Sequence, residues 1–378
     1  MSEKSRQAFE LYKKGNLGEA EKLCLEINIS NPNNYEILNL LGVILFQKKD
    51  YYQSIKFTKE SLKINPNQSD IYNNLGVAYI EIKKFSDALK YFDNALKINP
   101  NFTQAYNNLG IVYKELGRYD DAINCWKKII KINNNNPQAY NNIGNILLET
   151  KNEKDAIEYY EKAIKVDEKF YIGYYNLGNA FQKLNFTEKS IKNFTLAIKF
   201  NNYYAEAYYN RGNSYRNLNK LELALEDYHS AYKINPNLQY LFGNILNTKK
   251  DLCDWKNYEM DLVFLKKNIH HRKYIINPFS SLSVFDSTEI QKKIATDYVN
   301  EKYEKNDIKT KNNFLLTKLT NNKIKIGYYS SDFKEHAVSY LLAGVLEKHN
   351  KKEFEIFGFS LAPSKNDKMK ERIIKCFD

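Results

Sequence analysis

One histidine lies where an enzyme with an open α/β sheet would place a reactive group. His336 ends a polar loop, SSDFKEH (330–336), that follows the alternating apolar segment KIKIGYY (323–329). A helical segment (337–349) and a second apolar segment, FEIFGFSL (354–361), come next. This order predicts a strand, a helix and a parallel strand, and open α/β sheets bind ligands at the carboxyl ends of such strands. An imidazole in that place can donate or accept a proton near neutral pH.

The other polar residues of this loop are expected to have a more local role. Ser330, Ser331 and Asp332 can accept hydrogen bonds from backbone N–H groups, so we expect them to shape the loop and cap the following helix. No G-x-G-x-x-G sequence follows the first strand, which disfavours a dinucleotide site. The remaining histidines lie in a repeat helix, in a basic stretch or at a helix end: His229, His270, His271 and His349.

A second set of polar side chains recurs every 34 residues: Asn74, Asn108, Asn142, Asn176 and Asn210. A primary amide has two donors and an acceptor, so it can pair with both the C=O and the N–H of a peptide bond. Neighbouring helices pack about 8–10 Å apart and an extended peptide advances about 3.3 Å per residue, so one asparagine would meet about every third peptide residue. The set predicts a surface that holds an extended or disordered protein segment with little sequence preference.

A structural interpretation of the same asparagines stays open. Asparagine is frequent in this chain, and its amide can also bridge neighbouring helices. The preceding position of the repeat is asparagine in four units as well, so part of the pattern can come from the repeat consensus: Asn39, Asn73, Asn107 and Asn141.

These asparagines belong to a 34-residue period that a glycine marks most clearly: Gly42, Gly76, Gly110, Gly144, Gly178 and Gly212. A 34-residue period with this glycine is the signature of tetratricopeptide repeats, in which each unit is two antiparallel helices. Counting the glycine as position 8 gives seven units: 1–34, 35–68, 69–102, 103–136, 137–170, 171–204 and 205–238.

The other repeating positions have a mechanical meaning. Position 20 is Ala or Ser in every unit, and position 24 is bulky in five of them: Phe92, Trp126, Tyr160, Phe194 and Tyr228. Small residues allow close helix approach, and the rings fill the space that remains. One unit cannot bury its apolar face alone, so the sequence predicts an all-α superhelix of fourteen helices with a concave binding groove.

Composition limits the class of protein. The chain is 43% hydrophobic and 27% charged, which suits a packed fold. Its net charge of +12 is spread along the chain without a basic stripe, so we expect no nucleic-acid partner. No apolar run is long enough for a membrane span, and the N-terminus does not resemble a signal peptide. The four cysteines are far apart and form no metal motif, which favours a cytoplasmic protein with reduced thiols and no bound metal.

The glycine period fails after Leu238, because Leu246 stands where the next glycine would fall. We therefore expect a helical linker over residues 239–322. The capping pattern Asp286-x-x-Glu289 predicts the start of one of its helices, with three apolar residues on one face: Ile290, Ile294 and Tyr298.

Three segments carry a resemblance to a known family. They are LFGNILNTKKDLCDW (241–255), NPFSSLSVFD (277–286) and GYYSSDFKEHAVSYLL (327–342). All three are similar to bacterial members of glycosyltransferase family 41, the O-linked N-acetylglucosaminyltransferases. The resemblance implies transfer of N-acetylglucosamine from UDP-GlcNAc to Ser or Thr of proteins, without a cofactor, while the repeats recruit the acceptor. In the same resemblance His336 matches the active-site histidine of the family.

Compared with the catalytic region of this family, the last segment of the chain is short. The family's enzyme needs two Rossmann-like lobes of the GT-B type, and residues 323–378 cover only the first β-α-β unit of one lobe. A parallel sheet needs both faces covered and a domain typically needs about 100–150 residues. We therefore expect a truncated member that does not bind UDP tightly or transfer sugar alone. The alternative is a non-enzymatic tetratricopeptide-repeat scaffold for protein–protein interaction.

Overall fold

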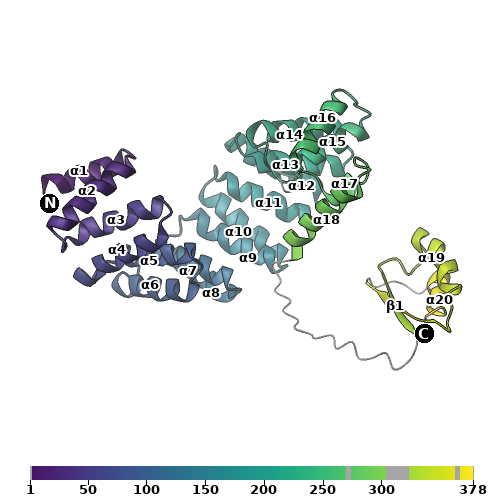
Figure 1. The fold of residues 1–378 in the computed structure, drawn as a ribbon, viewed down its shortest axis with the longest axis horizontal. Helices are drawn as coiled ribbons and strands as arrows, with labels where there is room; N and C mark the ends of the chain where they lie inside the picture. The colour runs from purple at the N-terminus through teal and green to yellow at the C-terminus, as the bar shows by residue number, and fades with distance from the viewer. Residues whose placement is uncertain (1, 270–273, 304–322, 362–366, 378) are drawn as a thin grey trace. The chain divides into compact units, whose positions relative to one another are not determined.

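The computed structural model describes residues 2–269, 274–303, 323–361 and 367–377. The chain divides into two compact units, Met1–Asn300 and Glu301–Asp378. The first unit holds helices α1–α17 and most of α18, and the second holds strands β1 and β2 with helices α19 and α20 (Figure 1). The expected class, helical repeats followed by the start of an α/β lobe, is confirmed.

Seven helical hairpins follow one another along the repeats (Figure 1). The first helices, called A helices, are α1 (Glu3–Lys13), α3 (Tyr35–Gln47), α5 (Ser69–Glu81), α7 (Thr103–Glu115), α9 (Pro137–Glu149), α11 (Tyr171–Lys183) and α13 (Ala205–Asn217). The second helices, called B helices, are α2 (Leu17–Ser30), α4 (Tyr51–Ile64), α6 (Phe85–Ile98), α8 (Tyr119–Ile132), α10 (Glu153–Val166), α12 (Thr187–Phe200) and α14 (Leu221–Ile234). The fourteen helices predicted from the glycine spacing are therefore present.

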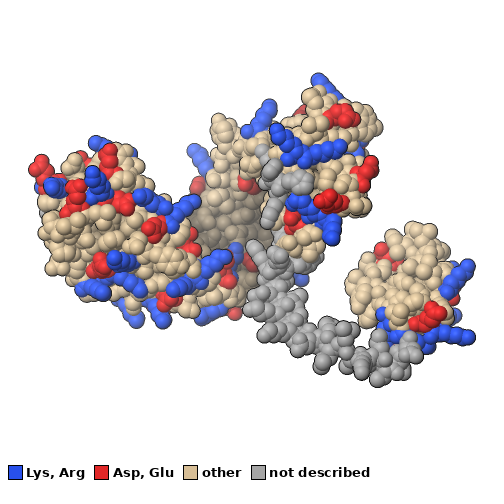
Figure 2. All heavy atoms as spheres, viewed as in Figure 1, with Lys and Arg blue, Asp and Glu red and all other residues tan. Residues whose placement is uncertain are grey.

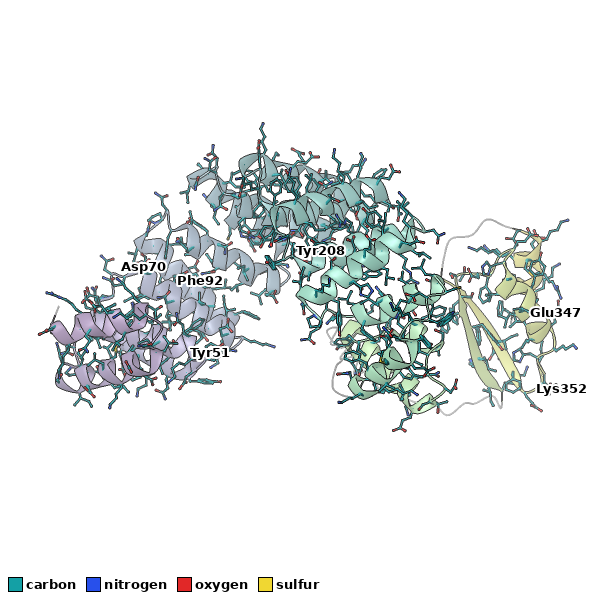
Figure 3. The ribbon with its side chains drawn as sticks, turned by 90° about the horizontal axis from the view of Figure 1, so that it is seen from above. Tyr51, Asp70, Phe92, Tyr208, Glu347 and Lys352 are labelled. Carbon is teal, nitrogen blue, oxygen red and sulfur yellow. The ribbon has the colours of Figure 1, made fainter. Side chains whose placement is uncertain are left out.

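In repeats 3 to 7 the hairpin closes on a contact between the position-8 glycine and the position-24 ring. In five repeats a Cβ on the glycine would lie 2.5 to 2.8 Å from the nearest atom of that ring. All five rings are buried, and Phe92 is labelled in Figure 3. The position-20 residues Ala88, Ala122, Ala156 and Ala224 have no exposed surface. The two helices of a repeat can therefore approach closely only because glycine and alanine face the ring.

The turn between the A and B helices has the same backbone conformation in all seven repeats. Position 15 has a positive φ, between 56° and 81°, at Gly15, Lys49, Lys83, Gly117, Lys151, Asn185 and Asn219. Only two of these residues are glycine, although L-residues with side chains adopt this left-handed region at a cost of about 1–2 kcal/mol. The helix packing on both sides holds the turn in this conformation.

Stacking of the repeats brings A helices together. α3 contacts α1 and α5, and α11 contacts α9 and α13, in addition to the contacts between consecutive helices. Because contacts of this kind recur between A helices, we infer that the A helices line the inner side of the curved stack. The side chains at positions 5, 6 and 9 therefore face the groove or the neighbouring A helix.

Four more helices follow the repeats: α15 (Leu241–Asp251), α16 (Tyr258–Asn268), α17 (Pro278–Ser281) and α18 (Thr288–Tyr303). α15 packs on α14, as the A helix of a further repeat would. Ile290 and Ile294 belong to the apolar cluster of this region, as predicted. The predicted cap was wrong by one residue, because Ser287 Oγ, and not Asp286, accepts the Ile290 N–H at 3.3 Å. The division of the chain at residues 238 and 322 stays a proposal.

The second unit is a small parallel β-α-β arrangement. β1 (Ile324–Ser330) pairs in parallel with β2 (Phe354–Ser360), with Ile324 opposite Phe354. α19 (Ala337–Glu347) connects them and α20 (Lys368–Ile374) follows. Arg372 of α20 makes a bidentate pair with Glu347 of α19, labelled in Figure 3, at 2.7 and 2.9 Å. The apolar side chains between the strands and the two helices form a common core.

Charged side chains of both signs are interspersed over the visible face of the repeats (Figure 2). This distribution agrees with a net charge that is spread along the chain. Among the described helices, none combines the length and the apolar character needed to cross a membrane.

We predict that Gly144→Ala destabilises the repeats, whereas Gly18→Ala does not. A Cβ at Gly144 would lie 2.6 Å from Tyr160, and overpacking of this kind costs about 1–3 kcal/mol. A Cβ at Gly18, inside helix α2, meets no atom within 4 Å, so alanine is expected to stabilise that helix by about 0.5–1 kcal/mol. Urea unfolding followed by circular dichroism measures both changes, and equal effects would contradict the packing argument.

Candidate functional site

The recurring asparagines form hydrogen bonds from one repeat to the next. From Asn108 onward, the position-6 amide donates to the position-5 side chain of the preceding repeat. In the middle of the array Asn108 Nδ2 lies 2.9 Å from Asn73 Oδ1, Asn142 Nδ2 3.3 Å from Asn107 Oδ1, and Asn176 Nδ2 2.8 Å from Asn141 Oδ1. We call each such pair a rung, and the series the asparagine ladder.

The last rungs use tyrosine at position 5. Asn210 Nδ2 donates to Tyr175 Oη at 3.1 Å and to Asn179 Oδ1 at 2.9 Å. Asn244 repeats this geometry with Tyr209 Oη at 3.0 Å and Asn213 Oδ1 at 3.3 Å. Asn244 lies in α15, beyond the last glycine of the period, and sequence reasoning missed it. Its distance of 34 residues from Asn210 was the signal that could have revealed it.

These bonds leave part of each amide free for another partner. The position-6 asparagines are half-buried, and in Asn108, Asn142 and Asn176 the rung uses one Nδ2 hydrogen. An amide has a second N–H donor and an oxygen with two lone pairs. The last rungs engage Nδ2 with two acceptors each, so there only the amide oxygen is left. In the middle rungs the helix-bridging interpretation accounts for one hydrogen of the amide, and the expected pairing with a peptide remains chemically possible for the rest.

The first rung differs from the others. Asn74 stands 35 residues after Asn39, at the spacing of the bonded rungs, yet no hydrogen bond joins the two described side chains. Among the residues that the structure describes, Asn39 Oδ1 is a buried side-chain oxygen without a hydrogen-bond donor. Asn74 instead lines a cavity of about 90 Å³.

His336 lies at the N-terminus of α19, after the loop that follows β1. Its backbone is extended, and its Nδ1 accepts a hydrogen bond from the Val338 N–H at 3.3 Å, so the imidazole caps the helix. Nδ1 lies 3.8 Å from Asp332 Oδ2, and the side chain is 45% exposed. The imidazole is therefore held by the helix on one side and open to solvent on the other.

The cap bond determines which nitrogen carries the proton. A ring nitrogen that accepts a hydrogen bond has no proton of its own, so the neutral His336 ring in this arrangement carries it on Nε2. Nε2–H is then a donor that can meet an oxygen of a bound molecule. To accept a proton at Nε2, the neutral ring would need its proton on Nδ1, which would replace the Val338 bond and approach Asp332.

The loop residues bond mainly to one another. Ser330 Oγ accepts the Asp332 N–H at 3.0 Å, and Ser331 Oγ donates to Asp332 Oδ1 at 3.3 Å. Ser339 Oγ of α19 donates to the Asp332 carbonyl oxygen. These contacts fix the loop between β1 and α19, while His336, not one of the three expected residues, provides the cap.

Asp367 also holds this loop, and sequence reasoning missed it. Its carboxylate caps α20 through the Lys370 N–H at 2.8 Å and accepts the Glu335 N–H, next to His336, at 2.9 Å. The backbone N–H groups of Lys370 and Glu335 hold the pKa of Asp367 below its usual range. The signal in the sequence was an aspartate directly before a helical segment.

Family models match both parts of the chain. Residues 252–378 match glycosyl transferase family 41. Tetratricopeptide-repeat models match residues 35–68, 69–102, 102–169 and 205–238. Residues 239–251 lie between the two kinds of match.

One relative is similar to a short stretch of the chain. The chain is 37% identical over 51 residues to the probable UDP-N-acetylglucosamine–peptide N-acetylglucosaminyltransferase SEC of Arabidopsis thaliana. This stretch covers 14% of the chain and spans only 5% of that relative.

Two solved structures share the repeat fold. A tetratricopeptide repeat protein from Parabacteroides merdae is 19% identical with a TM-score of 0.54, over 65% of this chain and 97% of that one. The C-terminal part of a repeat protein from Cytophaga hutchinsonii is 16% identical with a TM-score of 0.51, over 64% and 98%. The chain therefore joins an array of tetratricopeptide repeats to a segment that is similar to glycosyl transferase family 41.

Proposed function

We propose that this chain is part of a protein O-linked N-acetylglucosaminyltransferase. The enzyme would move N-acetylglucosamine from UDP-GlcNAc to Ser or Thr hydroxyls, and the repeats would recruit the acceptor protein. The match of residues 252–378 to glycosyl transferase family 41 carries this proposal. The relative from Arabidopsis thaliana, whose name states the same reaction, supports it over 51 residues.

The reaction needs a nucleophile and a stabilised leaving group. The acceptor hydroxyl oxygen forms a bond to the anomeric carbon of the sugar, while the bond from that carbon to the diphosphate oxygen breaks. UDP leaves with the electron pair, and the hydroxyl proton passes to a base or to solvent. The negative charge on the departing diphosphate must be stabilised by positioned donors.

His336 is suited to hold an oxygen of the donor or acceptor. With Nδ1 engaged by Val338, its Nε2–H points away from the helix cap and can donate to a substrate oxygen. A shift of the ring proton to Nδ1, toward Asp332, would free Nε2 to accept the hydroxyl proton. Asp332 would then act as the positioning residue for the imidazole, and Asp367 would position the loop.

The repeats would hold the acceptor as an extended segment. The half-buried amides of Asn108, Asn142 and Asn176 each have a donor and acceptor capacity left after the rung, which suits a peptide bond of any sequence. An extended protein partner in the groove of a cytoplasmic protein is therefore part of the proposal. A repeat scaffold without catalysis is the second candidate, but it gives no reason for the family 41 match.

The proposed reaction is tested by transfer of labelled N-acetylglucosamine from UDP-GlcNAc to a Ser/Thr-rich protein. The chain would be fused to the remaining catalytic region of a family 41 enzyme, and the 378 residues alone are the control without expected turnover. Transfer by the fusion supports the proposal. UDP binding without transfer by a folded fusion would favour the scaffold.

In the fusion, we predict that His336→Asn and His336→Ala both lower kcat by about 10²–10⁴-fold, the usual contribution of a positioned acid–base group. Asparagine is a good helix N-cap, so it replaces the bond to Val338 but not the imidazole chemistry. Circular dichroism checks that the fold is kept. Recovery of activity in the asparagine variant would show that His336 acts only as a helix cap.

For the ladder, we predict that the triple change of Asn108, Asn142 and Asn176 to alanine weakens binding of an extended Ser/Thr-rich peptide. Each lost hydrogen bond is expected to cost about 1 kcal/mol, which sums to about 3 kcal/mol. Fluorescence polarisation with the 378-residue chain measures the affinity. Asn124→Ala, on the exposed side of α8, is the matched control. Unchanged affinity in the folded triple variant would leave the ladder with a structural role alone.

A further inference from the structure

We propose that the cavity between repeats 2 and 3 is an anchor pocket for a phenylalanine side chain of the bound peptide. This inference rests on the proposed binding of an extended peptide by the repeats, and it adds a sequence preference to it. The ladder amides would form hydrogen bonds only with the backbone of the peptide, whatever its side chains. A side-chain pocket beside its first rung would fix where along the peptide binding begins.

The cavity has a buried floor of small side chains and a half-buried rim. Its volume is about 90 Å³, and α3, α4 and α5 line it. Gly42, Ser54 and Thr58 are buried at its floor, whereas Val43, Asn74 and Val77 at its rim are half-buried. The rim residues stand at positions 6 and 9 of their A helices, so the cavity opens toward the inner side of the stack.

The cavity exists because repeat 2 lacks its ring. In repeats 3 to 7 an aromatic side chain at position 24 covers the position-8 glycine. Repeat 2 keeps the glycine, Gly42, but has Thr58 at position 24. A Cβ at Gly42 would meet Thr58 Oγ1 first. The short threonine side chain therefore fills only the part of the space nearest the backbone, and the part that the ring occupies in other repeats is empty. The empty space therefore corresponds to the place of a planar six-membered ring.

The other repeats show where the outer end of such a ring lies. Tyr160 Oη donates to Asn145 Oδ1 at 2.9 Å, and Tyr228 Oη donates to Asn213 Oδ1 at 2.8 Å. Asn145 and Asn213 stand at position 9 of their repeats. In repeat 2 position 9 is Val43, which lines the rim of the cavity. A ring that enters from the groove would reach the same space from this side.

The lining selects the kind of ring. No Lys, Arg, Asp or Glu lines the cavity, so a charged side chain would lose hydration without a partner of opposite charge. Val43 cannot accept the hydroxyl hydrogen that Asn145 accepts from Tyr160, which disfavours a tyrosine side chain. At about 90 Å³ the pocket is smaller than the closed apolar cavity of about 150 Å³ that holds benzene, so the phenyl ring of phenylalanine would fill it and extend past its open rim.

The ladder is incomplete at the same place. Asn74, at the rim, makes no bond to Asn39, whose Oδ1 has no donor among the described residues. In the middle rungs the corresponding amide is held by the preceding repeat. The Asn74 amide therefore makes no hydrogen bond to Asn39, and it can form hydrogen bonds with the peptide backbone beside the phenylalanine.

Two synthetic peptides of twelve residues test the pocket. Both consist of Ser, Thr and Gly, with a single central Phe in one and Ala in the other. With the 378-residue chain we expect the Phe peptide to bind about tenfold more tightly, a difference of about 1.4 kcal/mol. Fluorescence polarisation gives both dissociation constants.

Filling the pocket should remove the preference. Thr58→Phe places a ring on Gly42, as in the five other repeats, and we expect the two peptides then to bind equally. Val43→Phe blocks the rim as a second, independent variant. Tyr160→Phe is the matched control, because it keeps a ring in repeat 5 and leaves the pocket of repeat 2 open. Circular dichroism confirms that each variant is folded.

The outcomes separate the two proposals. A Phe preference that Thr58→Phe or Val43→Phe abolishes and Tyr160→Phe keeps supports the anchor pocket. Equal binding of both peptides to the unmodified chain overturns the pocket but leaves peptide binding by the ladder intact. A preference that survives both filling variants places the ring elsewhere and also overturns it. Failure of both peptides to bind overturns the pocket together with peptide recruitment by the repeats.

Discussion

The contact between a glycine and an aromatic ring determines how the two helices pack in repeats 3 to 7. Where the ring lies against the glycine, the two helices can approach within a distance that any larger residue would prevent. The close approach fixes the hairpin, and the hairpin fixes which side chains of the A helix face the next repeat. The ladder depends on this geometry, because its bonds of 2.8 to 3.3 Å require each A helix to keep the same position relative to the preceding one.

The structural and binding interpretations of the asparagines are compatible. A side chain that is fixed by one hydrogen bond loses less conformational freedom when it binds a second partner. The rung therefore orients the amide before a peptide arrives. The His336 imidazole is arranged in a similar way, since the cap bond to Val338 orients the ring and leaves Nε2 in solvent. In both sites one polar atom serves the fold and another remains for a ligand.

Much of this could be predicted from the sequence because the repeat is periodic. The spacing of Gly76, Gly110 and Gly144 gave the helices, and the strand–loop–helix order gave the place of His336. The rung bonds could not be assigned, because they depend on the rotation of one hairpin against the next. The contact of Asp367 with the Glu335 N–H joins residues 32 apart, and nothing local in the sequence indicates it.

Departures from the period were harder to interpret. Arg211 stands where repeats 2 to 6 have leucine or isoleucine. The structure pairs it with Asp227 at 2.7 and 2.8 Å, with both side chains largely buried. A charged residue at a core position requires such a partner. Thr58 breaks the period in the opposite way, because it removes volume without a compensating residue within its own repeat.

The two asparagines of a middle rung are always 35 residues apart, and this constant separation limits how the gene can change length. Asn142 bonds to Asn107 in the preceding unit, and Asn108 bonds to the equivalent Asn73. If one whole unit of 34 residues were lost, such as 103–136, Asn142 would face Asn73 and find the same acceptor. Duplication of a unit would likewise create a new rung between old neighbours. Insertions within an A helix would rotate its asparagine away from the acceptor, so recombination that keeps every rung lengthens or shortens the groove in whole units.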